Sequence, residues 1–416
     1  MEIGKYSWGI GDRFTHQAEA QLKAIIMAKN SGIDIVPVWN KSNREHLFIH
    51  SEPASTREAA DIAVKKLSWT GQYFCDADHI NTNNVDRFMD ACDFFTLDVA
   101  DYIGKEASSE EINAFIDTNR KFIGNLVIPG ITKPFIITEN DVRNIAKKFL
   151  FAIKEASIIY QYIVKAKGEG NFIPEVSMDE VNDAQSPVEM FFILSAIALY
   201  KIPAQTIAPK FTGRFNKGVD YVGDIKQFAV EFEEDLLVID YAIKEFGLPK
   251  NLKLSIHSGS DKFSIYPVMG ELIKKYDKGI HVKTAGTTWL EEVIGLAEAG
   301  GDGLEVAKKI YADTYEHRNE MTAPYATVID IDFSKVPTPE EVNTWDSKKF
   351  AESLRHVHTN PNYNPNFRQL IHVAFKIAAN LGNVYTDALE KHAGIIGKQV
   401  TENLWERHIK LLFGIN

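Results

Sequence analysis

The sequence is poor in cysteine and in basic runs, and each shortage narrows what the protein can be. Its 416 residues include only two cysteines, Cys75 and Cys92, so a disulfide framework like that of small secreted proteins is excluded. The formal net charge is −11, and no block of Lys and Arg is present that would neutralise a run of phosphates. We therefore expect no nucleic-acid partner.

Long apolar segments are lacking too. The most apolar run, 190–200, is about half of the roughly 20 residues that a bilayer-spanning helix needs, so it predicts a buried helix and no membrane partner. The first residues carry charges where a signal peptide would have its apolar core. We therefore expect the protein to stay in the cytoplasm.

Common nucleotide-binding motifs, internal repeats and flexible linkers are also missing. Neither G-x-G-x-x-G nor G-x-x-x-x-G-K-[ST] occurs, so neither a dinucleotide-binding fold nor a P-loop is predicted. No internal repeat, low-complexity tract or Gly/Ser linker divides the chain, which favours one compact unit.

What the sequence does contain is a regular alternation of strands and helices. Helix starts are indicated by capping boxes at Ser55, Ser108 and Ser186, each followed by Glu three residues later. The strand-like runs are 6–9, 33–39, 72–75, 94–97, 172–176, 206–211, 252–256 and 281–285. Strands separated by long helices pair in parallel. Eight such units predict an α/β protein with a TIM-like (β/α)8 barrel, and the alternative is an open doubly wound sheet with a helical second domain.

The predicted barrel occupies residues 1–300. The connection between its fourth and fifth strands is too long for one crossover helix, so we interpret about 102–168 as a helical insertion. Residues 301–416 predict a C-terminal helical extension, with one extended run at 326–333, packed on the barrel as part of one compact unit. This extension is either a cap or an arm of a homo-oligomer.

Polar or ionisable side chains follow every predicted strand. In (β/α)8 barrels the catalytic groups come from the C-terminal ends of the strands, so this concentration predicts a site. The segment FCDADHIN places Asp76, Asp78 and His79 just after the third strand. Carboxylate oxygen and imidazole nitrogen together suit Zn²⁺, Mn²⁺ or a similar ion. The alternative is a helix N-cap cluster.

The segment LSIHSGSDKF places His257 at the end of the seventh strand. The amides of the Ser-Gly-Ser turn that follows, with Lys262, are suited to an anion such as a substrate carboxylate. The alternative is a tight turn with a capping serine. Together with His79, His257 favours a metal site with two histidines.

Glu175 lies near the end of the fifth strand. Apolar neighbours would raise its pKa and make it a general acid at neutral pH, and the alternative is a structural glutamate paired with Lys210 or Lys283. His356 and His358 lie in a polar loop and are interpreted as surface histidines.

Seven segments of the chain resemble, in order, the tagaturonate epimerase family. They are FCDADH, FFTLDVADYI, PEVSMDE, FTGRFNKGVDYVGD, LSIHSGSDKFSIYP, HVKTAGTTWLEEV and RQLIHV, and the likeness runs from Ser7 to Gly414. The resemblance implies a barrel enzyme of hexuronate catabolism that interconverts D-tagaturonate and D-fructuronate and uses a divalent metal of the Zn, Mn or Co type. Relatives carry a further N-terminal region.

The resemblance also implies roles for individual residues. The family's proton acceptor falls on Asp78 and its proton donor on Glu175, and its metal-binding histidines fall on His79 and His257. A third ligand is expected from coordination chemistry. The candidates are Asp76, Asp261 and His281, of which His281 is least suitable because it opens its strand and would lie toward the barrel floor.

The stereocentre that changes in such a substrate is β to the ketone, so simple enolisation cannot invert it. We expect a retro-aldol and aldol sequence, with Lys262 and Lys217 or Lys283 neutralising the sugar carboxylate and Asp261 as a further substrate contact. Another metal-dependent sugar-acid isomerase or a class II-type aldolase would use the same groups. A non-catalytic sugar-acid-binding protein is the remaining alternative, and the many ionisable groups at strand ends argue against it.

Overall fold

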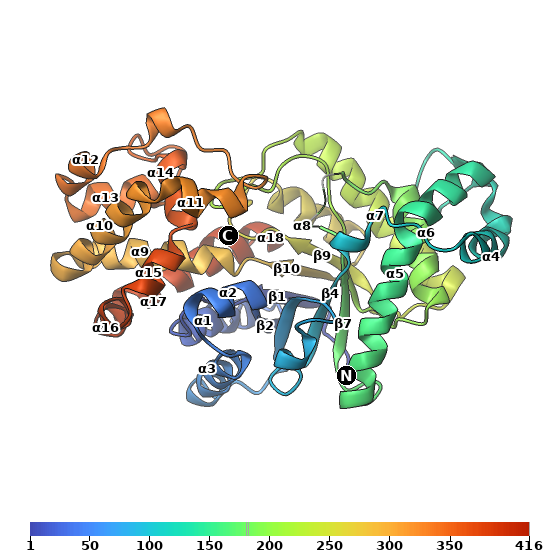
Figure 1. The fold of residues 1–416 in the computed structure, drawn as a ribbon, viewed down its shortest axis with the longest axis horizontal. Coiled ribbons are helices and arrows are strands. Elements are labelled where there is room, and N and C mark those ends of the chain that lie inside the picture. Colours follow the sequence, from blue (N-terminus) through green and yellow to red (C-terminus); the bar gives the residue numbers. More distant parts are fainter. Residues whose placement is uncertain (180, 182, 416) are drawn as a thin grey trace.

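Eight parallel strands close into a barrel in the computed structural model, which describes residues 1–179, 181 and 183–415 (Figure 1). The strands are β1 (Tyr6–Ile10), β2 (Ile35–Ser42), β3 (Phe74–Ile80), β4 (Phe94–Asp98), β7 (Ile173–Ser177), β8 (Thr206–Ala208), β9 (Lys253–His257) and β10 (Ile280–Lys283). They pair in chain order, and β10 pairs with β1 to close the ring. The predicted (β/α)8 barrel is confirmed.

Helices occupy the crossovers between consecutive strands. They are α1 (Ala18–Asn30), α2 (Asn43–Ile49), α3 (Pro53–Lys66), α4 (Ser109–Asn119), α5 (Glu139–Lys167), α6 (Pro187–Leu199), α7 (Ile225–Phe246) and α8 (Tyr266–Lys275), and α9 (Gly286–Ala299) follows the last strand. The crossover from β3 to β4 instead holds the short 3-10 turn Val85–Phe88. The apolar run expected to be a buried helix is α6, whose residues 190–197 are buried.

Two of the three predicted capping boxes are present. The side chains of Ser108 and Ser186 accept hydrogen bonds from the amides of Glu111 and Glu189, and both glutamates bond back to the capping residue. The prediction at Ser55 is wrong, because α3 already begins at Pro53. Proline fixes the helical φ angle at the first position of a helix, so the helix begins three residues earlier than a cap at Ser55 would place it.

The segment between β4 and β7 contains a feature that the sequence did not predict. An antiparallel hairpin, β5 (Gly124–Leu126) with β6 (Phe135–Ile137), separates α4 from α5. Its strands are too short to show an alternating pattern. The 29-residue helix α5 packs against α6 and also contacts β4, so it takes the place of a crossover helix in the ring around the barrel (Figure 1).

The C-terminal helices form a second hydrophobic core that adjoins the barrel at α9 and α1. They are α10 (Gly301–Glu316), α11 (Arg318–Thr322), α12 (Pro339–Asn343), α13 (Ser347–Leu354), α14 (Pro365–His372), α15 (Phe375–Asn380), α16 (Asn383–Lys391) and α17 (Ala393–Glu402). The last helix, α18 (Lys410–Phe413), packs on α8 and belongs to the core of the barrel. Between α17 and α18 lies the π-helical segment Asn403–Ile409. The run 326–333 is a loop rather than a strand: its Val328 carbonyl accepts from the Lys217 amide.

Inside the barrel, side chains of alternate residues form layers. The layer nearest the amino ends of the strands is apolar and includes Val38, Phe74, Phe94 and Ile173. Two residues further along β3, β4 and β7 come Asp76, Thr96 and Glu175, all of them buried. The barrel therefore becomes polar toward the carboxyl ends of its strands. Among the described residues, no helix is both long and apolar enough to cross a membrane.

The packing of α9 on α17 allows a matched test of the fold. A Cβ on Gly295 in α9 would lie 2.7 Å from the Cα of Ile396 in α17, whereas a Cβ on the exposed Gly394 in α17 would meet nothing within 4 Å. Gly295→Ala should lower the free energy of unfolding by about 1–3 kcal/mol. Gly394→Ala should leave it unchanged or raise it by up to about 1 kcal/mol. Chemical denaturation measures both, and equal effects would contradict this packing.

Candidate active site

A cavity of about 370 Å³ opens at the carboxyl ends of the strands. Most of its polar wall comes from the ends of different strands or the loops that follow them. These residues are Asp78 and His79 from β3, Asp98 from β4, Asp179 after β7, Lys217 after β8, His257 from β9 and Lys283 from β10. The cavity therefore lies where the strand-end pattern predicted a site.

His79 is held in an unusual backbone conformation. Its φ is +52°, in the left-handed region that non-glycine residues rarely adopt, and the register between β3 and β4 shifts between Ala77 and Ile80. Such bulges turn a side chain away from its regular direction, often beside active sites. The Nδ1 atom of His79 lies 3.3 Å from Oδ2 of Asp98, which fixes the ring.

His257 is oriented in the same way, by a carboxylate bound to one ring nitrogen. Its Nε2 lies 2.9 Å from Oε1 of Glu175. Its Nδ1 lies 3.2 Å from Oδ1 of Asp179 but forms no hydrogen bond within the described part of the chain. The rings of His79 and His257 meet edge to face, with centroids 5.3 Å apart.

His79, Asp179 and His257 form a group whose ligand atoms all lie within 4.8 Å of one another. Burial opposes a charge on either imidazole, but Asp78 outweighs it at His79 and raises the pKa of that ring, and Asp179 raises the pKa of His257 to about 9. The group thus lies in a negative field, as a cation site requires. Asp179 was not among the three candidates for a third ligand, although it lies in the PEVSMDE segment just beyond β7.

A single ammonium group, that of Lys283, joins the buried carboxylates. Its Nζ lies 2.7 Å from Oδ2 of Asp76, 3.0 Å from Oδ1 of Asp78 and 2.9 Å from Oε1 of Glu175. The Thr96 hydroxyl lies 2.9 Å from Oδ1 of Asp76 and 3.0 Å from Oε1 of Glu175. The structure therefore brings Asp78 and Glu175 into contact with the same positive charge, and Lys283 is occupied by three ion pairs.

The surroundings of Glu175 differ from those expected. They are ionic rather than apolar: burial alone would raise its pKa, but Lys283 and His257 lower that pKa well below its usual value. Glu175 is fully buried and is not among the described residues that line the cavity. Its Oε1 has three partners, whereas Oε2 has no hydrogen-bond partner among the residues described.

The carboxylate with a raised pKa is Asp76. Burial raises the pKa of Asp76 to about 7 despite its ion pair with Lys283. Burial would also raise the pKa of Asp78, but Lys283 and His79 outweigh it and lower that pKa. The lowered pKa of Asp78 keeps this cavity residue ionised at neutral pH, while Asp76 beneath it has a pKa near neutrality and can hold or release a proton. His281 lies lower still, with its Nδ1 2.8 Å from the Ser7 hydroxyl.

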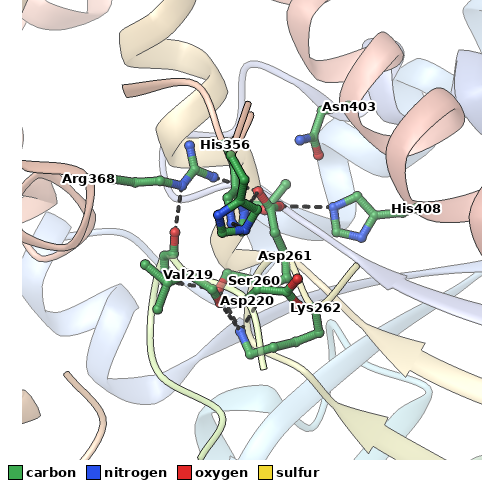
Figure 2. A network of polar contacts seen from close by, with 12 residues as sticks. Val219, Asp220, Ser260, Asp261, Lys262, His356, Arg368, Asn403 and His408 are labelled. Atoms are coloured by element: carbon green, nitrogen blue, oxygen red, sulfur yellow. Dashed lines mark hydrogen bonds and ion pairs between the residues drawn. The ribbon is translucent and has the colours of Figure 1, made fainter. Parts of the chain in front are cut away.

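Asp261 and Lys262 do not reach this cavity. Asp261 is fully buried and its two carboxylate oxygens contact His356, Arg368, His408 and the Thr287 hydroxyl (Figure 2). The Lys262 ammonium donates to the carbonyls of Asn216, Val219 and Asp261. These two residues join the loop after β9 to the loop after β8 and to the C-terminal helices, so the structure does not support a direct contact of either with substrate.

Further residues that line the cavity come from the ends of other strands or the loops after them and from the C-terminal helices. Lys217 lines the cavity as expected of a substrate-binding residue, and so do Arg13 and Asn40, from the ends of the first two predicted strands. His372 also lines it, at the end of α14. His356, interpreted as a surface histidine, is buried, because its ring packs beside Phe263 and bonds to Asp261.

Comparison with known proteins identifies the family. The model of the tagaturonate epimerase family matches residues 1–408. The chain belongs to the tagaturonate epimerase family. Members of this family are isomerases that act on sugar acids, and the chain is therefore an enzyme of that class.

Individual members of the tagaturonate epimerase family resemble the whole chain. A tagaturonate/fructuronate epimerase from Thermotoga maritima is 28% identical over 428 residues, which cover 98% of this chain and 81% of that protein. A glycerol-complexed crystal structure of the fructuronate–tagaturonate epimerase of Cohnella laeviribosi superposes with a TM-score of 0.81 at 21% identity, covering 99% of this chain and 82% of the other. The native structure gives 0.79 at 22% identity with the same coverage. The barrel and its C-terminal helices thus share one fold with these structures.

The ion network of Asp261 predicts a large effect on stability. Asp261→Asn leaves the buried Arg368 guanidinium without its carboxylate partner, which should lower the free energy of unfolding by about 3–5 kcal/mol. The control is Asp277→Asn, which removes an exposed ion pair with Lys5 and should not change stability measurably. Urea denaturation of the two variants decides the matter. Similar small shifts would show that the network does not hold the C-terminal helices on the barrel.

Proposed function

We propose that the protein interconverts D-tagaturonate and D-fructuronate, with a divalent metal and an acid–base pair in the cavity at the carboxyl ends of the strands. The observation that carries this proposal is that Asp78 and Glu175 both contact the Lys283 ammonium and that each also lies beside a histidine of the group His79, Asp179 and His257. Family membership supplies the class of substrate. A cavity of about 370 Å³ is in the range of small-molecule sites and accommodates a six-carbon sugar acid.

The donor set fits a divalent metal such as Zn²⁺, Mn²⁺ or Co²⁺. Asp98 occupies Nδ1 of His79 and Glu175 occupies Nε2 of His257, so Nε2 of His79 and Nδ1 of His257 remain for an ion. Metal-binding histidines commonly have a carboxylate on the other ring nitrogen in this way. Asp179 adds an oxygen donor beside the Nδ1 atom of His257 that lacks a partner. Two imidazoles and a carboxylate with an open position suit a catalytic ion.

The reaction requires one proton to leave the hydroxyl oxygen on the carbon that is inverted and one to return to that oxygen after the carbon has presented its other face. The bound ion would act as a Lewis acid toward the ketone oxygen of the sugar. Asp78, which lines the cavity and is ionised, accepts the proton of the hydroxyl on the carbon that is inverted. The bond from this carbon to its neighbour α to the ketone then breaks, leaving an aldehyde and an enediolate within the cavity. Rotation of the aldehyde exposes its other face, and the bond forms again with inverted configuration.

Glu175 is the proposed source of the proton that returns to the new alkoxide, and because it lies behind the cavity wall the proton must pass through a group that lines the cavity. Its Oε1 is fixed by Thr96, His257 and Lys283, while Oε2 lacks a partner among described residues and is the oxygen that exchanges protons. Glu175 must first gain that proton, and Asp76, whose pKa is raised to about 7, is the carboxyl group of the Lys283 cluster that can supply it. Asp78 and Glu175 thus divide the two proton transfers between them.

We also propose that the protein is cytoplasmic and forms a homo-oligomer, as expected from the sequence. Cys75 and Cys92 are buried and unpaired with each other, as expected in a reducing compartment. The formal net charge of −11 favours solubility in water. Light scattering coupled to size-exclusion chromatography distinguishes a monomer from an oligomer.

Removal of the metal should abolish activity. We expect D-fructuronate incubated with the reconstituted protein to yield D-tagaturonate, observed by NMR, and a chelator to stop the conversion until Zn²⁺, Mn²⁺ or Co²⁺ is added. Three-carbon fragments in place of the epimer would indicate an aldolase, and a product with the ketone moved would indicate another isomerase. Full turnover by protein shown by elemental analysis to be free of metal would refute the metal role.

The acid–base pair and the metal ligands should respond differently to substitution. Asp78→Asn and Glu175→Gln should slow turnover by roughly 10²- to 10⁴-fold and leave the metal bound. His79→Ala and Asp179→Ala should lose the metal itself. Metal content by mass spectrometry, measured beside the rate for each variant, separates the two groups. If Asp78→Asn emptied the metal site, Asp78 would be a ligand rather than a base.

A further inference from the structure

His372 has no role in the chemistry proposed above, yet it is built into the wall of the cavity. It is the last residue of α14 and only 2% of its surface is exposed. Its Nε2 has no hydrogen-bond partner within the described ranges 1–179, 181 and 183–415. A buried polar atom without a partner is costly, so such an atom in a cavity wall indicates a ligand that supplies the missing bond.

Two glycines surround this nitrogen. A Cβ on Gly286 would lie 2.1 Å from the carbonyl oxygen of Gly259 and 3.2 Å from Nε2 of His372. Gly259 has a φ of +66°, and a Cβ there would lie 3.3 Å from the Lys217 ammonium. The turns after β9 and β10 thus lie so close together that a residue with a Cβ atom would not fit at Gly286. Lys217 and His372 are both beside this cradle, and all four residues line the cavity.

Helix α9 begins at the same place. It starts at Gly286 and runs for 14 residues, has no acidic residue in its first turn, and has no side-chain cap among the residues that the structure describes. The amino end of a helix carries a partial positive charge, which favours an anion. The partial charge of α9 and the ammonium of Lys217 therefore act on the same small volume.

The charges around His372 are also positive. Burial lowers the pKa of His372 well below its usual value, and Arg13 and Lys217 lower it further. The ring is consequently neutral at physiological pH, with one ring nitrogen able to donate a hydrogen bond. A neutral donor surrounded by cations and by a helix amino end suits a carboxylate.

The C-terminal helices hold His372 in this position. Arg368, one turn earlier in α14, donates to the carbonyls of Gly218 and Leu354 and to Oδ2 of Asp261 (Figure 2). A Cβ on Gly218 would lie 3.3 Å from the Cβ of His372, so the loop that carries Lys217 packs directly against α14. The Asp261 network thereby fixes Lys217 and His372 relative to each other.

We propose that Nε2 of His372, the amino end of α9 and the Lys217 ammonium bind the carboxylate group of the sugar acid and set the preference for acids over neutral ketoses. This inference rests on the proposed function, which supplies the sugar acid. It assigns carboxylate binding to residues on the outer wall of the cavity, while Lys283 remains paired with the catalytic carboxylates. His372 is a residue for substrate specificity with no part in proton transfer.

The test compares an acid with a neutral sugar in His372→Phe. We expect the KM for D-fructuronate to rise at least about tenfold, with a smaller change in kcat, because a hydrogen bond to a charged group is lost. The KM for D-fructose, which lacks the carboxylate, should change less than about twofold by the same reasoning. His372→Gln keeps a donor and should restore part of the loss. Equal losses on both sugars would overturn the proposal.

A binding measurement separates this inference from the proposed reaction. Calorimetry with D-gluconate, an acid without a ketone, and with D-sorbitol needs no turnover. If the wild type does not convert D-fructuronate but His372→Phe weakens D-gluconate binding alone, the proposed reaction fails and the carboxylate site stands. Unchanged D-gluconate binding in His372→Phe overturns the site whether or not the enzyme turns over.

The matched control is His46→Phe. His46 is also buried, and burial lowers its pKa to about 3, but its ring contacts Phe88 and Ser51 rather than the cavity. The His46→Phe variant should be less stable than the wild type, but the ratio of its affinity for the acid to its affinity for the neutral sugar should not change. If His372→Phe does not fold, Lys217→Met replaces it in the same comparison, and an unchanged preference for the acid would then overturn the proposal.

Discussion

The ion pairs of Lys283 are the interaction on which the rest of the site depends. Three carboxylates buried in one barrel would repel one another and lose their hydration, and a charge in such surroundings is tolerated only when it is paired. Lys283 satisfies this condition for Asp76, Asp78 and Glu175 at once. It comes from β10, the strand that closes the barrel against β1, so the strand that completes the barrel also supplies the charge that pairs the carboxylates of the site. Through Glu175 the ammonium also orients His257, and with it the nitrogen that faces Asp179.

Asp261 is the buried carboxylate that links the barrel to the C-terminal helices. Its carboxylate accepts hydrogen bonds from Arg368 and contacts two histidines that lie far apart in the sequence, His356 and His408. In the reaction proposed above the barrel strands supply the groups that move protons, while α14 adds His372 to the wall of the cavity. One buried carboxylate therefore sets the position of this part of the C-terminal helices relative to the barrel.

The sequence predicted the barrel and much of the site because both follow local rules. Strand ends in a parallel barrel converge, so Asp78, His79, Lys217, His257 and Lys283 could be assigned to one cavity before their distances were known. Charge pairing across the barrel has no local signal. Lys262 and Lys283 both follow strands, and only the three-dimensional structure shows that one donates to backbone carbonyls and the other to carboxylates. Asp179 and the buried His356 were missed for the same reason.

In the proposed reaction, Glu175 has to meet two demands that at first conflict. A carboxylate that orients a metal-binding histidine must hold its hydrogen bond throughout the reaction, whereas a carboxylate that exchanges protons must change its own. The two oxygens divide these demands: Oε1 is fixed by three partners, and Oε2 lacks a partner among the described residues. Because protonation of Oε2 need not break any bond to Oε1, His257 keeps its orientation in both states of Glu175. The ammonium of Lys283 then compensates the charge that Glu175 carries when Oε2 is ionised, so proton transfer can proceed without rearrangement of the barrel interior.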